Sequence, residues 1–179
     1  MKSATLISLI GIFALHGIPL LAQQRNDPVE VAVEAIQATP YGVNVTLKAL
    51  RLDEELNIMI GLTEGEAIAR VLRHQPPQRP MTHDLIKMIL DQTGWQVQEV
   101  LIRGIRGTTY LADLVLERDG ETKIIDARPS DAMAIAVRFD AKIFVAPKVF
   151  EGQRRLEQPE PGEEPKQETS PSPEGGVHL

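Results

Sequence analysis

Apolar and polar positions alternate along the first part of the chain with the two-residue period of half-buried β-strands. Residues Val29 to Ile36 read VEVAVEAI, and the alternation returns from Val43 to Leu52 after the turn residues Pro40-Tyr41-Gly42. This spacing predicts a β-hairpin, since two alternating runs flank a short turn. The apolar run from Leu56 to Leu62 predicts a third, short strand.

Apolar positions then recur at helical spacing in two segments. A helix is predicted from Glu64 to His74, where Thr63 and Glu66 match the hydroxyl-to-acid spacing of a capping box. A second helix is predicted to begin near Thr82 and to end before glycine 94, a residue type that commonly terminates helices. The apolar stripe of this second helix consists of Leu85, Ile86, Met88, Ile89 and Leu90.

The second half of the domain repeats the order of strands followed by a helix. Asp119-Gly120 is a strong signal for a tight hairpin between two apolar runs. The predicted elements are strands at 95–105, 108–117, 121–127 and 142–145, a helix at 130–139, and a last turn around Val149-Phe150. With roughly seven or eight strands and about three helices, the chain is predicted to be an α+β domain with a mixed or largely antiparallel sheet.

One segment of the first half aligns without gaps on a segment of the second half. Residues Ile58 to Arg73, IMIGLTEGEAIARVLR, align with Lys123 to Arg138, KIIDARPSDAMAIAVR. A duplication would give two similarly built halves related by a pseudo-two-fold axis. Two unrelated strand-to-helix units with small packing residues would look similar, so both interpretations stay open.

Both ends of the chain differ in composition from the domain between them, predicted at 27–155. Residues 1–22 predict a secretory signal peptide, with Lys2 before an apolar run and Ala22 at its end. A retained membrane anchor is the alternative, but the apolar run is short for a span. We therefore expect an exported protein, periplasmic or secreted, without a membrane span once the signal is cleaved. Residues 156–179 are rich in Pro, Glu, Ser and Gly and predict a disordered acidic tail.

The formal net charge of −6 is concentrated in that tail, so the domain itself is close to neutral. A near-neutral domain argues against nucleic-acid binding through bulk positive charge, although a local site remains open. The chain contains no cysteine, which excludes disulfides, zinc-thiolate sites and thiol nucleophiles.

Two predicted helix starts share an unusual order of residues: arginine, proline, a hydroxyl residue and aspartate. They are Arg79-Pro80-Met81-Thr82-His83-Asp84 and Arg128-Pro129-Ser130-Asp131. Thr82 and Ser130 are expected to cap free amides of the first turn, and aspartate suits the positive end of the helix dipole. The arginines are not explained in this way, since a cation is unfavourable at that end.

A helix N-terminus beside an arginine is a ready site for a phosphate group, because backbone amides and guanidinium donors converge on one anion. His83 would add a base that works near neutral pH, and Asp84 and Asp126 could hold a divalent cation. Taken one by one, these residues favour a structural explanation, in which Arg128 pairs internally with Asp84 or Asp131. The spacing matches no established metal-binding motif.

These segments resemble the bifunctional nuclease family, which is named for activity on DNA and RNA. The resemblance rests on RPMTHDLIKMIL at 79–90 and IIDARPSDAMAIAVR at 124–138, supported by IGLTEGEAIARVL at 60–72 and AKIFVA at 141–146. It covers about residues 56–151, most of the predicted domain. One departure is Met81, where leucine is usual in the family, and this swap conserves side-chain volume.

The resemblance implies a nuclease that hydrolyses phosphodiester bonds of DNA and RNA, with Mg²⁺ or Mn²⁺ as the expected cofactor and no metal ligands assigned. The implied catalytic residues are His83, Asp84, Asp126 and Asp131, and the implied substrate-binding residues are Arg79, Thr82, Arg128 and Ser130. The alternative is a non-catalytic binding module in which the arginines and aspartates form a structural salt-bridge lock. That alternative predicts a buried, doubly paired Arg128. Assembly into a homo-oligomer is left open.

Overall fold

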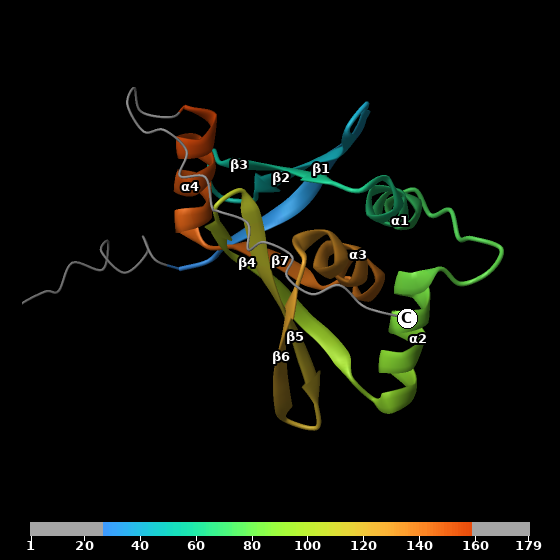
Figure 1. Cartoon of the computed structure of the whole chain (residues 1–179). Coiled ribbons are helices and arrows are strands. Elements are labelled where there is room, and N and C mark those ends of the chain that lie inside the picture. The colour runs from blue at the N-terminus through green and yellow to red at the C-terminus, as the bar shows by residue number, and fades with distance from the viewer. Residues whose placement is uncertain (1–26, 159–179) are drawn as a thin grey trace, which may run out of the picture.

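The structure, a computed structural model, describes residues 27–158; the predicted signal peptide and nearly all of the predicted tail lie outside them. The fold is α+β, as predicted, with one mixed sheet of seven strands and with four helices (Figure 1). The strands are β1 (Val29–Thr39), β2 (Gly42–Ala49), β3 (Glu55–Ile60), β4 (Gln96–Arg106), β5 (Thr109–Arg118), β6 (Glu121–Ala127) and β7 (Lys142–Val145). The helices are α1 (Leu62–Leu72), α2 (Thr82–Thr93), α3 (Pro129–Phe139) and α4 (Pro147–Glu157).

The strand order of the sheet is β3-β2-β1-β7-β4-β5-β6. Neighbouring strands are antiparallel, except that β4 and β7 are parallel. The meander β1-β2-β3 leads into α1, and the meander β4-β5-β6 leads into α3, so the two halves flank β7 in mirrored order. This topology agrees with the duplication that the aligned segments suggest.

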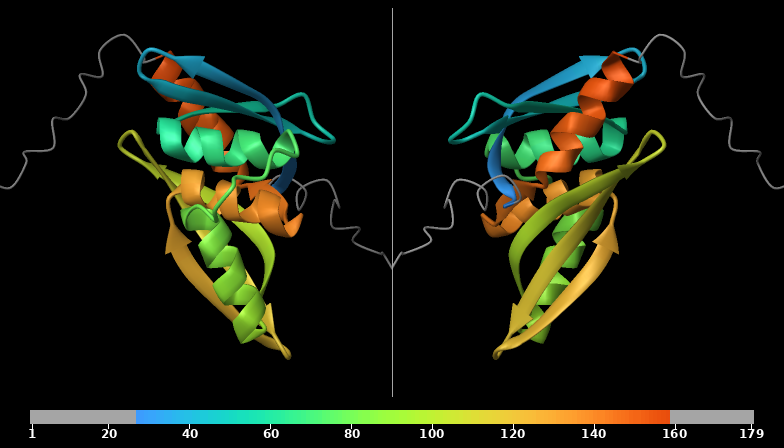
Figure 2. Two further views of the ribbon diagram at one scale, coloured as in Figure 1. Left: turned by 90° about the vertical axis from the view of Figure 1, so that its right-hand side faces the viewer. Right: turned by 90° about the vertical axis from the view of Figure 1, so that its left-hand side faces the viewer.

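Three of the helices pack together over the sheet. Helix α3 contacts both α1 and α2 and packs on β4 and β5, whereas α1 packs on β2. Gly65 allows this close approach of α1, because a Cβ atom there would lie 2.6 Å from Cγ2 of Val43. The side chains of Ile68, Val100 and Met133 are fully buried between helices and sheet. Helix α4 lies apart from the other three, against β3 and β4 (Figure 2).

Helix α4 was not expected, since the sequence predicts only a turn around Val149-Phe150. Its buried residues are Val149, Phe150 and Gln153; the segment is mostly polar, so the helical spacing of its few apolar positions was overlooked. The helix ends at Glu157, two residues beyond the expected end of the domain at 155. None of the described helices is both long enough and apolar enough to cross a membrane.

The expectation that hydroxyl side chains cap the helices is wrong. The predicted caps are Thr63, Thr82 and Ser130, but the N-cap positions are occupied by Gly61, Met81 and Arg128. Each hydroxyl residue lies inside the first turn because the helix begins earlier than the capping pattern suggests. In α2 a carboxylate serves instead, since Oδ2 of Asp84 accepts a hydrogen bond from the backbone N–H of Met81 at 2.9 Å.

Candidate active site

The first turns of three helices meet at one place on the surface. Glu64 lies in the first turn of α1, His83 in that of α2 and Asp131 in that of α3, and Arg128 is the N-cap residue of α3. The Nη2 atom of Arg128 donates to Oε1 of Glu64 at 2.9 Å, and Nε2 of His83 lies 3.2 Å from Oδ1 of Asp131. We call these four residues the surface cluster. It brings three positive helix ends together, which favours an anionic ligand.

Arg128 is the exposed centre of the surface cluster. Its Nε donates to Oδ2 of Asp131 at 2.7 Å and its Nη2 to Oδ1 at 3.1 Å, a two-point contact that fixes the guanidinium plane. The pKa of Arg128 is raised above its ordinary value, mainly by the hydrogen bond to Asp131 and to a smaller extent by the contact with Glu64. The group therefore stays charged. The side chain is nevertheless 68% exposed. Its Nη1 group donates no hydrogen bond within residues 27–158 and is open to an external acceptor.

His83 and Asp131 form a histidine–aspartate pair beside this guanidinium. Partial burial by itself raises the pKa of Asp131, but hydrogen bonds from Arg128 and His83 outweigh it and hold that pKa below the ordinary carboxyl value. Asp131 is therefore ionised at neutral pH and can accept the Nε2–H of His83; in that neutral tautomer the imidazole lone pair is on Nδ1. His83 is buried to 5% exposure. No buried polar side-chain atom of the described residues lacks a partner, so Nδ1, which has none, retains contact with solvent.

A second cluster lies deeper and joins the same three helices. Nε of Arg138 donates to Oδ1 of Asp84 in α2 at 2.7 Å, while its Nη1 donates to the carbonyl oxygens of Ala134 at 2.6 Å and of Ala67 in α1 at 3.3 Å. The Arg138 side chain is only 4% exposed. Burial raises the pKa of Asp84, but the hydrogen bonds from Met81 and Arg138 outweigh burial and lower the pKa below its ordinary value. We call Asp84 and Arg138 the buried pair.

The structure separates Asp126 from these clusters. Asp126 is opposite Asp113 in the β5–β6 ladder, and Asp113 alternates with the buried residues Ala112 and Leu114. Since neighbouring strand residues point to opposite faces, Asp113 and Asp126 face away from the core and from α3. Both bind Arg103, through Nε at 2.7 Å and Nη2 at 2.6 Å respectively. The expected proximity of Asp126 to His83 is therefore wrong, because strand parity turns this carboxylate to the other face.

The other predicted residues occupy three different settings. Arg79 lies in the loop before α2, is exposed and forms no salt bridge with the residues that the structure describes. Thr82 is exposed at the first position of α2, and Ser130 is buried in the first turn of α3. Neither hydroxyl makes a hydrogen bond within residues 27–158. Asp84 does not pair with Arg128, as one interpretation of the sequence suggests, because it binds Arg138 instead.

Sequence reasoning missed Glu64 and Arg138 as members of the two clusters. Glu64 looked like an ordinary first-turn acid, and its partner Arg128 is 64 residues away. Arg138 is aligned with Arg73 in the repeat, which marked it as a repeat feature and not as a buried cation. The available signal was its place in a helix with almost no polar face, PSDAMAIAVRF, where an arginine must either be exposed or find partners.

The carboxylates of the surface cluster do not form a metal site as they stand. No group of three or more histidine, cysteine, aspartate or glutamate side chains among residues 27–158 is placed to hold a metal ion. Arg128 binds both carboxylate oxygens of Asp131 and Oε1 of Glu64, so a cation would have to compete with the guanidinium for these atoms.

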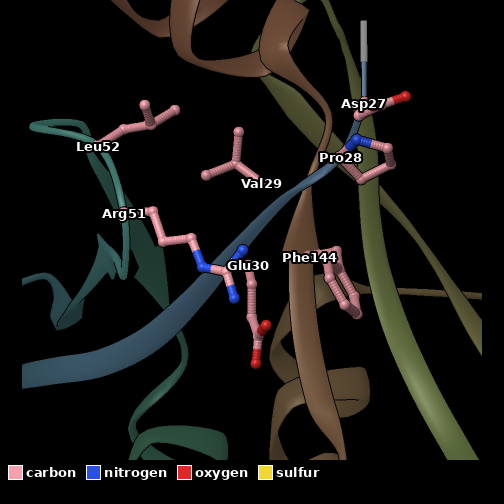
Figure 3. A pocket seen from close by; sticks show the side chains of 7 residues that line it. All are labelled: Asp27, Pro28, Val29, Glu30, Arg51, Leu52 and Phe144. Carbon is pink, nitrogen blue, oxygen red and sulfur yellow. The ribbon is translucent and has the colours of Figure 1, made fainter. Parts of the chain in front are cut away.

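Two pockets of similar size flank the domain, and one of them has no connection with these clusters. That pocket, about 370 Å³, is lined by the start of β1, the turn after β2 and Phe144 of β7 (Figure 3). None of its seven labelled side chains is a predicted site residue. The other pocket, also about 370 Å³, is lined in part by Asp84 and Arg138 and therefore borders the buried pair.

Comparison with known proteins decides the family. The family model for the bifunctional nuclease domain matches residues 45–157, an interval that contains both clusters. The chain belongs to the bifunctional nuclease domain family. Two uncharacterized proteins of Mycobacterium tuberculosis, MT1877 of strain CDC 1551 and Rv1829 of strain H37Rv, are similar to this member of the family. Each is 36% identical over 122 residues, which cover 68% of this chain and 71% of the relative.

Proposed function

We propose that this bifunctional nuclease domain hydrolyses phosphodiester bonds of DNA and RNA at the surface cluster. The observation that carries the proposal is the exposed guanidinium of Arg128, placed where three helix N-termini meet and next to a histidine–aspartate pair. An internal salt bridge does not need this exposure, whereas a phosphate group does. Family membership supports the same activity.

In the proposed reaction each member of the cluster has one task. The free Nη1 group of Arg128 binds a non-bridging phosphate oxygen and stabilises the charge that develops on it. Nδ1 of His83 accepts a proton from the attacking water, whose oxygen forms the new bond to phosphorus while the bond to the leaving oxygen breaks. Asp131 orients His83 and stabilises the imidazolium that results. Arg79, exposed in the preceding loop, contributes a second positive charge toward the nucleic-acid backbone.

The alternative is a structural salt-bridge lock, which requires a buried and doubly paired Arg128. Arg128 is doubly paired, with Asp131 and Glu64, but its side chain is 68% exposed. The buried residue with several partners is Arg138. The lock and the proposed catalytic cluster are therefore two separate groups of residues on the same three helices.

A divalent cation belongs to the proposal as a condition to be tested. Mg²⁺ is commonly held by one or two carboxylates together with substrate phosphates, so Asp131 and Glu64 could contribute ligands once a phosphate engages Arg128. Export through the N-terminal signal and assembly into a homo-oligomer also remain predictions.

The test is cleavage of labelled single-stranded DNA and RNA by the full chain, with Mg²⁺, with Mn²⁺ and with EDTA. Arg128→Ala is expected to lower kcat/KM about 100-fold or more, as for the loss of one charged donor to a transition state. His83→Gln is expected to lower it by roughly 10²–10⁴-fold, the range for a general base. Thermal melts show whether each variant is folded.

The matched control is Arg103→Ala. Arg103, like Arg128, is a partly exposed arginine that binds two carboxylates, but it lies on the other face of the sheet. Its replacement should leave cleavage within about twofold, since surface substitutions away from a site have small effects. No cleavage by the wild type under any of the three ionic conditions, or equal loss in all three variants, would refute the proposal.

A further inference from the structure

The pocket that borders the buried pair has the features of a ligand site. It lies between the end of α1, the loop that follows it and α2, and its volume is about 370 Å³. Its lining includes Val71, His74, Pro76, Pro77, Asp84 and Arg138, and we call it the loop pocket. This volume is in the usual range for small-molecule sites. Three prolines at 76, 77 and 80 stiffen the loop, so the wall of the pocket is largely preformed.

Arg138 presents an unused donor to the loop pocket. Its Nε and Nη1 atoms are hydrogen-bonded, but Nη2 donates to no residue in the described part of the chain. No fully buried polar side-chain atom there lacks a partner, so Nη2 must retain some contact with solvent. Because the side chain is only 4% exposed and Arg138 lines the loop pocket, we infer that this contact is with the pocket. A buried donor of this kind favours a ligand that brings an acceptor.

The charges around the loop pocket favour a neutral ligand over a free phosphate. Arg138 is balanced by Asp84, and Arg70, also in the lining, is balanced by Glu66 through a hydrogen bond of 2.9 Å from Nε. The remaining wall is formed by the apolar residues Val71, Pro76 and Pro77 together with the polar residues His74 and Gln75. A planar group with a carbonyl oxygen at its edge would use both the apolar wall and the free donor, and guanine, cytosine, thymine and uracil have this chemistry.

We propose that the loop pocket receives one unstacked base of a single-stranded nucleic acid. The proposal rests on the proposed function, because the phosphodiester of that strand would lie at the surface cluster. The two sites adjoin: Asp84 lines the loop pocket and its neighbour His83 belongs to the surface cluster. The free Nη2 group donates to a carbonyl oxygen of the base, and the proline wall packs on its face. A duplex would have to unstack a base first, so the protein prefers single strands.

The first experiment compares two probes that share a backbone. Fluorescence anisotropy measures binding of the full chain to a labelled single-stranded oligonucleotide, and to an abasic strand of the same length, in EDTA. Base stacking and one hydrogen bond should make the first at least tenfold tighter. Equal affinities would mean that the phosphates alone are recognised, and this outcome would overturn the proposal. The comparison requires no variant, so it does not depend on folding of a mutant.

A pocket-filling variant then locates the binding site. Val71→Trp fills the loop pocket and should remove most of the preference for the base-containing strand, with little effect on the abasic strand. Its control is Leu72→Trp on the same helix, which lines a different and smaller pocket and should keep the preference. The idea is wrong if both variants, shown by melts to be folded, retain the wild-type preference. Base-dependent binding without cleavage would refute the nuclease activity alone, since anisotropy does not depend on turnover.

Discussion

Two arginines lie at the two ends of α3. Both form ion pairs that link α3 to neighbouring helices, but their side chains differ in exposure. Arg128 at the start binds Glu64 of α1 and reaches α2 only through Asp131, which contacts His83. Arg138 near the end binds Asp84 of α2 and the carbonyl oxygen of Ala67 in α1. The side chain of Arg128 is 68% exposed and that of Arg138 is 4% exposed. On the proposals above, the exposed guanidinium binds a phosphate, whereas the buried one holds the three helices together and leaves one donor for the loop pocket.

The physical reason is the cost of desolvation. An exposed ion pair contributes little to stability because water competes for both charges. A buried pair often contributes little net energy either, but removing one partner leaves an uncompensated charge in the interior, which is strongly unfavourable. The two arginines should therefore respond in opposite ways to the same substitution: stability should depend on Arg138 and activity on Arg128.

Arg138→Ala should have the largest effect on stability. It leaves Asp84 without its guanidinium and two carbonyl oxygens without their donor, so the free energy of unfolding should fall by about 3–5 kcal/mol. Urea denaturation followed by circular dichroism measures this fall. Arg128→Ala in the same series should leave the urea midpoint nearly unchanged. A similar loss in the two variants would mean that exposure does not separate their roles.

The contribution of the buried pair should depend on pH. The folded state lowers the pKa of Asp84 below the ordinary value of 3.8. A carboxyl group with a lowered folded pKa stabilises the fold above its unfolded pKa, and this stabilisation is lost as pH falls through the folded pKa. Wild-type stability should therefore fall as pH is lowered from 5 through 4 to below 3.

Asp84→Asn isolates this effect, because asparagine does not titrate. At pH 6 the variant should lose about 1.5–3 kcal/mol of unfolding free energy, the range for a hydrogen bond to a charged group. The difference from the wild type should shrink toward pH 3, when the urea midpoints of both proteins are measured across that range. A difference that stays constant with pH would show that the Asp84 charge is not what stabilises the pair.

Glu64→Gln tests the surroundings of Arg128, the exposed arginine of the comparison. Glu64 shares Nη2 of Arg128 and places a negative charge beside the proposed phosphate site. Removing that charge should tighten binding of single-stranded nucleic acid a few-fold, because one competing anion is lost. Anisotropy titrations at two salt concentrations test this expectation. Weaker binding by the folded variant would indicate that Glu64 helps to hold the ligand or its cation.

Most of the fold could be predicted because its signals are local. The alternation of β1 and β2, the Asp-Gly turn between β5 and β6 and the stripe of α2 each act within a few residues. Helix α4 was missed although its few apolar positions have helical spacing, because the segment is mostly polar and its buried side depends on contacts with β3 and β4. The helix starts were placed one or two residues late because a hydroxyl residue fits either the cap or the first turn.

The candidate site could be predicted only in part, because its partners are distant in sequence. The two Arg-Pro segments located His83, Asp131 and Arg128, and the structure brings these three together. The ion pairs of Arg128 with Glu64 and of Arg138 with Asp84 span 64 and 54 residues, and no local rule identifies them. The face of the sheet on which Asp126 lies could have been predicted from the sequence, since Asp126 alternates with Ile125 and Ala127 on a strand.

Asp126→Asn should therefore have the smallest effect of all. The side chain is 77% exposed on the face of the sheet that points away from α3, where it shares Arg103 with Asp113. Loss of one exposed partner should change the free energy of unfolding by no more than about 0.5 kcal/mol, since Asp113 still holds the guanidinium. Cleavage should stay within about twofold of the wild type.

This variant is informative because Asp126 lies in the same motif as Asp131, the carboxylate that is assigned to the proposed site. Asp126 and Asp131 belong to the same DARPSD segment, five residues apart, so proximity in sequence would give both the same role. Asp131→Asn is the matched substitution: it weakens the contacts with Arg128 and His83 and should lower kcat/KM about 100-fold. If the Asp126 variant lost as much activity as the Asp131 variant, with wild-type melts, the catalytic groups would have to span both faces of the sheet. A single site at the surface cluster could not then explain the activity.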